Sequence, residues 1–388
     1  MNSLPPDPRA TSEHGPDTAD SGPAGSGYSG SARVTDFGTL PSSGQSAQLY
    51  TVSAPDGSIV TKITNYGARL VSLYVPDREG VRRDVVLGTD DLAAYVADTD
   101  CLGAIPGRNA NRIAGARFSL NGIEYRLNAN EGLNNLHSGP DGYEHRLWEC
   151  VDLTDSSVTL SLSSPDGDQG MPANLRLSVT YALFNSGRCD LTFSALSDGD
   201  TILNPTTHTY FNLEGADSDT TIEENILQLN SSVMCTVESS DYIPTGKRPV
   251  ADTPCDFREP TELGAVLQSD DPQLSYGKGL NHCFLVEGAS QVSASELADM
   301  KPVARLCALG SGICLRMWSD LPSVLVYTAD YLEDFPGKSG HRYGARAGVC
   351  LEPGFVPNSI NNDPEDLQPV LTANTPYERR VQYRFSVN

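Results

Sequence analysis

Two segments far apart in the sequence carry the side chains best suited to moving protons near neutral pH. Residues 204–215, NPTTHTYFNLEG, contain His208, and residues 348–361, GVCLEPGFVPNSIN, contain Glu352. An imidazole and a carboxylate can act as general acid and general base when a fold holds them in one pocket. The two segments therefore predict proton-transfer chemistry, provided that the fold brings them together.

Each of these residues, taken alone, has a more common structural explanation. A glutamate such as Glu352, which follows an apolar run and precedes Pro353, is more often an ion-paired residue at the end of a strand. A lone histidine such as His208 is more often bonded to a backbone carbonyl. The end of a buried strand is nevertheless a place where scaffolds present side chains to ligands, so the functional interpretation stays open for both.

The sequence lacks the spacings of the common metal and nucleotide motifs. Its six histidines form no H-x-H or H-E-x-x-H pattern, and no cysteine pair is spaced as in a zinc site. Neither a G-x-S-x-G elbow nor a G-x-x-x-x-G-K-[ST] loop occurs. We therefore expect no metal site and no nucleotide site.

Composition and charge limit the classes of partner. The chain has 388 residues, 38% of them hydrophobic, and a formal net charge of −23. Such a surface repels phosphate backbones and anionic membranes, so we expect no nucleic-acid or membrane partner, and an anionic ligand would need a local basic pocket. No apolar run approaches the roughly 18 residues of a membrane helix, and the first ten residues lack the apolar stretch of a secretory signal.

The nine cysteines predict a reducing compartment. Their number is odd, none forms a C-x-x-C pair, and a chain of this length does not need disulfides to fold. We expect reduced thiols in a cytoplasmic protein, mostly buried as small hydrophobic residues. The cysteines are Cys101, Cys150, Cys189, Cys235, Cys255, Cys283, Cys307, Cys314 and Cys350.

The chain divides into a tail and one folded region. Residues 1–32 are rich in Pro, Gly, Ser and Asp and contain few large apolar residues, so they are predicted to be disordered. No linker and no repeat of 20–50 residues divides the remainder. Residues 33–388 are therefore predicted to form a single domain.

The elements of this domain are predicted to be mostly β. Residues 157–163 and 175–183 alternate between apolar and polar side chains with a period of two. Residues 118–125 form a predicted hairpin, because Asn121-Gly122 is a favoured type I′ turn pair. Helix signals are short: one at 90–96 with an Asp cap, and one turn at 259–264. Many short strands with few helices favour a large antiparallel β-sandwich or barrel.

Taken together, the motifs resemble the aldose 1-epimerase (galactose mutarotase) family over essentially all of residues 34–388. Residues 107–113, GRNANRI, are similar to the family's G-R-x-A-N-R-I, and 204–215 to its N-x-T-N-H-S-Y-F-N-L. Each motif is weak alone, but several in the family's order are specific. The others are NNLHSG at 134–139 followed by LWE at 147–149, IPTG at 243–246, DFR at 256–258, GLNH at 279–282, VYT at 326–328 and CLE at 350–352.

The resemblance implies a β-supersandwich and the interconversion of the α and β anomers of a free aldose, without a redox cofactor or metal. It implies Glu352 as general base and His208 as general acid. It also implies a shell of side chains that reads the sugar hydroxyls and ring oxygen. That shell comprises Asn111, Arg112, His137, Tyr210 and Asn281.

The chain departs from the family pattern at three places. Asn281 stands where the family usually has Asp, Leu325 where many members have Gln, and Pro353-Gly354 where Thr-Gln is usual. An amide at 281 loses the charge that strengthens hydrogen bonds to hydroxyls. We therefore expect an altered preference relative to galactose, for another aldose or a sugar-like lactol.

Two alternatives remain at this stage. The same fold could serve a non-catalytic sugar-binding or regulatory protein, because a fold does not determine function. The chain could also epimerise a hexose 6-phosphate, because Lys338, His341, Arg342 and Arg346 precede the Glu352 segment and could hold a phosphate. A glycosidase would need a second catalytic carboxylate, for which the sequence offers no clear candidate. We expect a monomer or a weak dimer.

Overall fold

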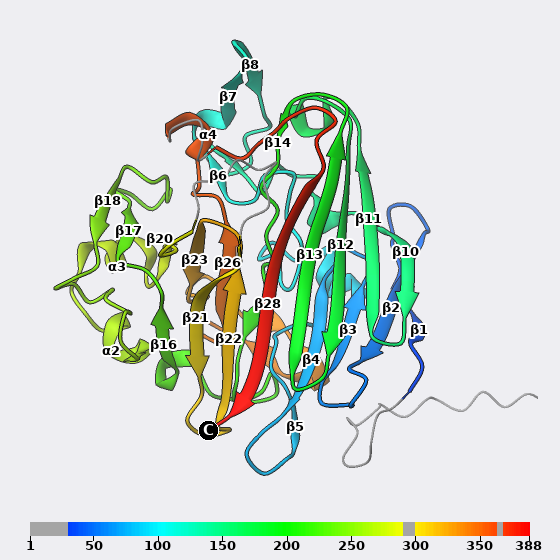
Figure 1. Cartoon of the computed structure of the whole chain (residues 1–388), viewed down its shortest axis with the longest axis vertical. Helices are drawn as coiled ribbons and strands as arrows, with labels where there is room; N and C mark the ends of the chain where they lie inside the picture. The colour runs from blue at the N-terminus through cyan, green and yellow to red at the C-terminus, as the bar shows by residue number, and fades with distance from the viewer. Residues whose placement is uncertain (1–29, 290–298, 363–367) are drawn as a thin grey trace, which may run out of the picture.

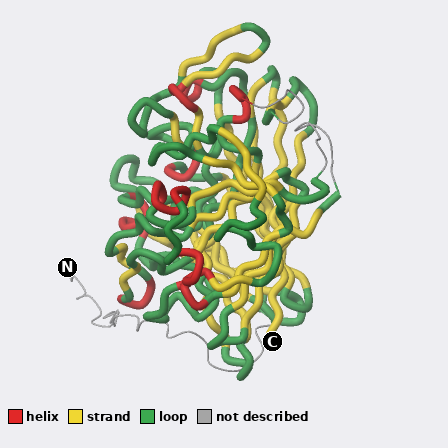
Figure 2. The backbone as a smooth tube through the Cα atoms, turned by 90° about the vertical axis from the view of Figure 1, so that its left-hand side faces the viewer, coloured by secondary structure: helices red, strands yellow, loops and turns green. Residues whose placement is uncertain are grey.

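The computed structural model describes residues 30–289, 299–362 and 368–388. These residues form three large antiparallel β-sheets and several two-stranded ribbons (Figure 1). Figure 2 shows that strands dominate and that helices occur only as short segments. The prediction of an all-β antiparallel architecture is confirmed.

The largest sheet has nine strands and lies at the front of the molecule in Figure 1. The predicted strand at 175–183 extends by one residue, and its apolar residues at alternate positions are all buried. Burying one such side chain contributes about 1.5–3 kcal/mol, so this face holds the strand on the core. In sheet order, the strands are β10 (Glu149–Thr154), β11 (Ser157–Ser164), β12 (Leu175–Phe184), β13 (Arg188–Ser197), β28 (Tyr377–Val387), β22 (Ile313–Ser319), β21 (Lys301–Cys307), β16 (Ile226–Leu229) and β19 (Thr261–Glu262).

Two further sheets share the core with this one. Buried residues of all three, such as Leu73, Phe193 and Val326, belong to one hydrophobic cluster. The five-stranded sheet contains β1 (Arg33–Thr39), β2 (Ser46–Ser53), β3 (Val60–Thr64), β4 (Leu70–Pro76) and β5 (Arg82–Asp84). The six-stranded sheet contains, in order, β15 (Tyr210–Phe211), β26 (Val349–Gly354), β23 (Ser323–Tyr327), β20 (Asn281–Leu285), β17 (Val233–Thr236) and β18 (Gly246–Pro249).

The ribbons include the predicted hairpin. Asn121 and Gly122 connect its strands, and both have positive φ (52° and 77°), as a type I′ turn requires. The four ribbons are β6 (Arg112–Ile113) with β9 (Asn135–Leu136), β7 (Arg117–Leu120) with β8 (Ile123–Arg126), β14 (Thr201–Ile202) with β27 (Val370–Leu371), and β24 (Phe335–Pro336) with β25 (Arg342–Tyr343).

The helices confirm one prediction and correct another. The side chain of Asp91 caps α1 (Leu92–Val96) by accepting a hydrogen bond from the Ala93 amide, as predicted. The turn predicted at 259–264 is misplaced, because Thr261 and Glu262 pair as β19 and α2 (Leu263–Leu267) begins after them. The other described α-helices are α3 (Pro272–Gly277) and α4 (Ser359–Asn362). One-turn 3₁₀ segments are η1 (Ala114–Ala116), η2 (Tyr143–His145), η3 (Asp168–Gly170), η4 (Ile222–Glu224) and η5 (Lys338–Gly340).

The cysteines correct a second prediction. Cys307 and Cys314 form a disulfide, so the nine thiols are not all reduced. The physical reason is the register of β21 and β22, which places these two residues directly opposite each other with their Cα atoms 4.2 Å apart. Sequence spacing alone did not reveal this pairing. The other seven cysteines are free, and all but Cys150 are buried.

Most of the predicted N-terminal tail lies outside the described residues. Residues 1–29 of the predicted tail lie outside the described residues, and β1 begins at Arg33. Among the described residues, no helix combines the length and apolar character needed to cross a bilayer. The assignment of 33–388 to a single domain stays a prediction.

Candidate active site

The seven residues named from the sequence line one hollow of about 370 Å³. They come from β6 and the residue before it, the residue after β9, the segment before β15, and strands β15, β20 and β26. Sequence reasoning did not single out several other residues that line the same hollow. These are Thr99, Asp100, Cys101, Glu131, Leu136, Ser240, Tyr242, Tyr327 and Tyr331.

The strand β26 carries Glu352 into this hollow. It pairs with β23 on one side, where Glu352 lies opposite Leu325, and with β15 on the other, where Cys350 lies opposite Tyr210. Side chains two residues apart on a strand share a face, so Cys350 and Glu352 both point to the same side. The prediction that Glu352 ends its strand is wrong, because pairing continues through Pro353 and Gly354.

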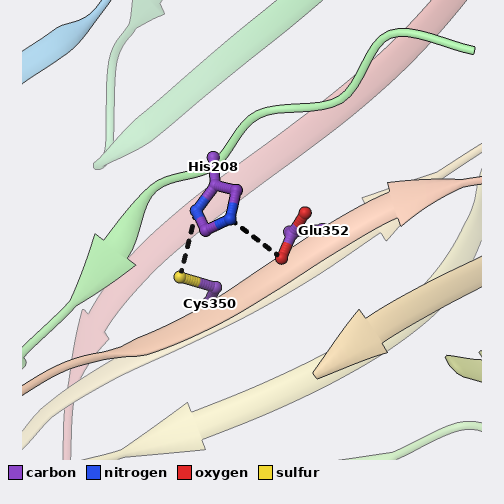
Figure 3. A group of neighbouring side chains, drawn as sticks. All are labelled: His208, Cys350 and Glu352. Carbon is purple, nitrogen blue, oxygen red and sulfur yellow. Dashed lines mark hydrogen bonds and ion pairs between the residues drawn. The ribbon is translucent and has the colours of Figure 1, made fainter. Parts of the chain in front are cut away.

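His208 is held by its backbone and by the rings around it. Its amide donates to the carbonyl of Ala104, and its carbonyl accepts from the amide of Gly103, both at 2.9 Å. The ring stacks on Tyr210 with centroids 5.1 Å apart. His208 Nε2 lies 3.6 Å from Glu352 Oε1, and Nδ1 lies 3.6 Å from Cys350 Sγ (Figure 3). The imidazole therefore stands between a carboxylate and a thiol.

Burial moves the pKa values of the pair in opposite directions. His208 is 7% exposed and Glu352 3%, and removal from water disfavours the charged form of each group. Burial lowers the pKa of His208 to about 4, although Asp98 acts in the opposite direction. Burial raises the pKa of Glu352 to about 8, against the opposing effects of Arg112 and Asn111. Mutual attraction was expected to favour the charged forms of both groups, whereas burial moves both pKa values toward the neutral forms.

One carboxylate oxygen has no protein partner. Glu352 Oε2 is buried and makes no hydrogen bond with the described residues. Leaving such a group unsatisfied costs about 1–3 kcal/mol, and because Glu352 lines the hollow, a ligand bound there is expected to satisfy it. The arrangement suits a ligand hydroxyl that donates to Glu352.

A ribbon opposite β26 supplies the remaining polar groups. The β6–β9 pair places Asn111, Arg112 and His137 together, and the amide of His137 donates to the Asn111 carbonyl at 3.1 Å. Asn111 and His137 have positive φ (61° and 51°), which is uncommon for residues other than glycine. Such local strain is often found at functional sites.

The hydrogen bond to His137 determines which of its ring nitrogens carries the proton. The Asn111 amide donates to His137 Nδ1 at 3.2 Å. Burial, with further contributions from His208 and Arg112, lowers the pKa of His137 well below its ordinary value, so the ring is neutral near pH 7. A neutral imidazole that accepts at Nδ1 carries its proton on Nε2. His137 is therefore a neutral donor and not a second acid.

Aromatic and charged side chains form the rim of the hollow. The Arg112 guanidinium makes two 2.7 Å contacts with Glu131 and lies 4.9 Å from the Tyr242 ring centroid. The hydroxyls of Tyr242 and Tyr331 are 2.6 Å apart. Tyr242 directly precedes the IPTG motif and Tyr327 lies in the VYT motif, so the motifs contained a signal for these aromatic residues.

Of the departures from the family pattern, Leu325 and Pro353-Gly354 adjoin Glu352, and Asn281 lines the same hollow from β20. Asn281 lines the hollow, opposite Tyr327 on β23. Leu325 lies directly across from Glu352 and provides an apolar neighbour. At Gly354, a Cβ would lie 3.0 Å from Asn204 Oδ1, so the Asn204 side chain occupies the space beside this glycine.

The basic residues considered for phosphate binding lie elsewhere. Lys338 is buried and its amino group contacts Asp84 at 2.6 Å. Arg346 pairs with Glu223 and Asp330, and Arg342 pairs with Asp334. None of these cations is among the residues that line the hollow. The hexose 6-phosphate alternative therefore lacks the phosphate-binding group on which it depended.

One group of metal-binding atoms occurs among the described residues. Single atoms of His208, Cys350 and Glu352 lie within 4.8 Å of one another. Nitrogen, sulfur and oxygen ligands suit Zn²⁺. A metal ion bound there would be coordinated by His208 and Glu352, the two side chains that are best placed to exchange protons.

The fold and the site define a class of protein: an antiparallel β-sandwich that presents a histidine–carboxylate pair to a polar hollow. The aldose 1-epimerase family model matches residues 48–384. The chain is 32% identical to aldose 1-epimerase of Escherichia coli K12 over 89% of this chain and 97% of that protein. It is 34% identical to the galactose mutarotase of Mus musculus over 91% and 98%.

Solved structures agree with this relationship. An aldose epimerase homologue from C. elegans superimposes with a TM-score of 0.79 and 26% identity, covering 88% of this chain and 99% of that one. A galactose 1-epimerase from Lactobacillus acidophilus gives a TM-score of 0.77 and 25% identity, covering 92% and 99%. The chain belongs to the aldose 1-epimerase family.

Proposed function

We propose that this protein is an aldose 1-epimerase, an isomerase that interconverts the α and β anomers of a free sugar by general acid–base catalysis. The observation that carries the proposal is the facing pair His208 and Glu352, both of which line a polar hollow. Family membership supports the same reaction.

The reaction needs two proton transfers, and the site offers one group for each. The Glu352 carboxylate accepts the proton of the C1 hydroxyl, while His208 Nε2–H donates a proton to the ring oxygen. The C1–O5 bond breaks, the C1–C2 bond rotates, and the ring closes on the other face as both protons return. Each positioned group contributes roughly 10²–10⁴-fold to the rate. Asn111, Arg112 and His137 would hold the hydroxyls.

The pKa values determine how many protons the His208–Glu352 pair holds near neutral pH. Between the pKa of His208, about 4, and that of Glu352, about 8, the pair holds one proton, mostly on Glu352. The form that reacts, ionised Glu352 with protonated His208, has the same number of protons. It is reached by moving that proton within the pair, so the titration belongs to the pair as a whole.

The direct test combines activity with binding. Anomer interconversion is followed by polarimetry, and Glu352→Gln and His208→Asn should each reduce it by at least about 10²-fold. Retained activity in either variant would reject the assignment. Sugar binding by calorimetry without any acceleration in the parent protein would favour the non-catalytic binding alternative.

The residues that depart from the family pattern bear on which sugar the site prefers. Asn281 removes a charge at the hollow and Leu325 places an apolar side chain next to Glu352. We expect weaker use of galactose than of another aldose or a sugar-like lactol. Polarimetry over a panel of aldoses, with glucose and glucose 6-phosphate compared directly, tests this expectation. Galactose turned over as well as any other sugar would contradict it.

Compartment and assembly complete the proposal. Seven of the nine cysteines are free, which suits a reducing compartment, whereas the Cys307–Cys314 disulfide does not. On the majority of free thiols we propose that the protein acts in the cytoplasm, as a monomer or weak dimer. Light scattering on the purified protein and fractionation of cells test these two points. An exported protein or a stable higher oligomer would contradict them.

A further inference from the structure

A row of arginines crosses the outer face of the nine-stranded sheet. Arg305 on β21 lies opposite Arg316 on β22, Arg316 opposite Arg384 on β28, and Arg384 opposite Arg188 on β13. Figure 1 shows these four strands side by side. Neighbouring strands lie about 4.7–4.9 Å apart, so the four residues are close neighbours. They face outward because the residues beside each of them on its strand are buried.

Most of this row lacks compensating charge. Arg188 pairs with Asp190. The other three arginines make no ion pair with any residue in the described part of the chain, and Arg305 Nε is buried without a partner. Like charges directly opposite each other destabilise a sheet. In a chain with a net charge of −23, this is a local positive strip that a bound anion would stabilise.

A hollow of about 450 Å³ adjoins the row. Its lining includes Arg305 and Arg316 of the row, Arg258, and the half-buried Trp318, with Glu287 as the one carboxylate among the lining residues. Trp318 and Arg316 are two residues apart on β22 and therefore share its outer face. The volume lies within the range of small-molecule sites, about 300–1,000 Å³. The hollow thus combines an aromatic ring with guanidinium groups.

We propose that this hollow and the adjoining row bind a nucleoside di- or triphosphate. Guanidinium groups bind phosphate through paired, charge-assisted hydrogen bonds, and an indole offers a surface on which a base can stack. With the base on Trp318, the phosphates would extend along Arg305 and Arg316. Arg384, whose guanidinium carbon lies 5.8 Å from the centroid of the Trp318 ring, would flank the base. Side chains would supply the donors, so the site needs no glycine-rich loop. It is separate from the sugar site, because the two hollows share no lining residue.

Tryptophan fluorescence of the full chain provides the test. The chain has two tryptophans, and Trp148 is only 1% exposed, so quenching by an added nucleotide reports on Trp318. ATP and inorganic tripolyphosphate are the probes. We expect ATP to quench the fluorescence and to bind at least about fivefold more tightly than tripolyphosphate because its base stacks. Both affinities should fall with added salt.

Three variants separate the contributions. Arg316→Ala should weaken ATP binding by about tenfold or more, because it removes a charge-assisted contact. Trp318→Leu, followed by calorimetry, should reduce ATP affinity to the level of tripolyphosphate. Arg126→Ala is the matched control, because Arg126 is an exposed arginine on the β7–β8 hairpin, and its ATP affinity should stay unchanged. Urea unfolding midpoints show that each variant is folded.

Several results would overturn the proposal. Failure of millimolar ATP to bind would reject the site. Equal losses in Arg316→Ala and Arg126→Ala would show non-specific attraction only. Equal affinity for ATP and tripolyphosphate would reject the nucleoside as the ligand. None of these measurements uses sugar turnover, so failure here and failure of the proposed epimerase activity are distinguishable.

Discussion

Replacing Glu352 by Gln should stabilise the protein while removing its activity. Glu352 has a folded pKa of about 8 against an ordinary value of 4.5, because burial disfavours its charge. The gap between these values corresponds to about 5 kcal/mol. Since the folded pKa is raised, the stability contributed by the proton is complete below pH 4.5 and is lost as the pH rises through about 8. At pH 7 the loss already amounts to about 3 kcal/mol.

A glutamine keeps the shape and the neutral state of the protonated acid but cannot ionise. The parent and Glu352→Gln should therefore have similar unfolding free energies near pH 4.5. The variant should be more stable by about 3 kcal/mol at pH 7. Urea unfolding at a series of pH values measures this difference, and Glu124→Gln at an exposed position is the matched control.

The difference between parent and variant must grow with pH if burial controls the Glu352 pKa. A constant difference, or a parent that gains stability over the variant toward alkaline pH, would refute the reasoning. Polarimetry on the same samples should show a loss of at least about 10²-fold. The catalytic carboxylate would then be a source of instability that is retained for function.

The remaining predictions concern the same pair and its neighbours. The pH profile of kcat/KM should be bell-shaped, with the acidic limb near pH 4 reporting the titration of His208 and the alkaline limb near pH 8 that of Glu352. An alkaline limb near 6.5 would show that burial does not lower the His208 pKa. Cys350→Ala removes the contact to His208 Nδ1 and should lower kcat about fivefold with little change in KM; an unchanged kcat would show that the thiol does not position the ring. Asn281→Asp should raise kcat/KM for galactose about fivefold by restoring a charged acceptor, and polarimetry that detects no gain would place the altered preference elsewhere.

Much of the fold was predictable because its signals are local. The alternation at 175–183 follows from the period of a strand with one buried face, and β12 has that pattern of burial. The turn at Asn121-Gly122 follows from the backbone angles that these residues tolerate. The helical turn predicted at 259–264 failed because pairing with β16 extends residues 261 and 262. Propensity over a few residues does not contain that information.

The sequence predicted which residues line the hollow, but not the pKa values of His208 and Glu352. All seven residues named from the motifs line one hollow, because the order of motifs along the chain reflects a fold shared with relatives. The sequence did not reveal that burial moves the pKa values of His208 and Glu352 toward their neutral forms. Attraction between two groups can be inferred from their types, whereas desolvation depends on everything packed around them.

The sequence by itself determined the strand periodicity, the acidic character and the residue types available for proton transfer. Only the tertiary structure decided that Cys307 faces Cys314, that Glu352 lies within a strand, and that Arg305, Arg316 and Arg384 lie in one row. The physical reason is that side-chain periodicity is local to each strand, whereas sheet order and register join segments that are distant in the chain. Solvent exposure, and with it each pKa, follows from that assembly.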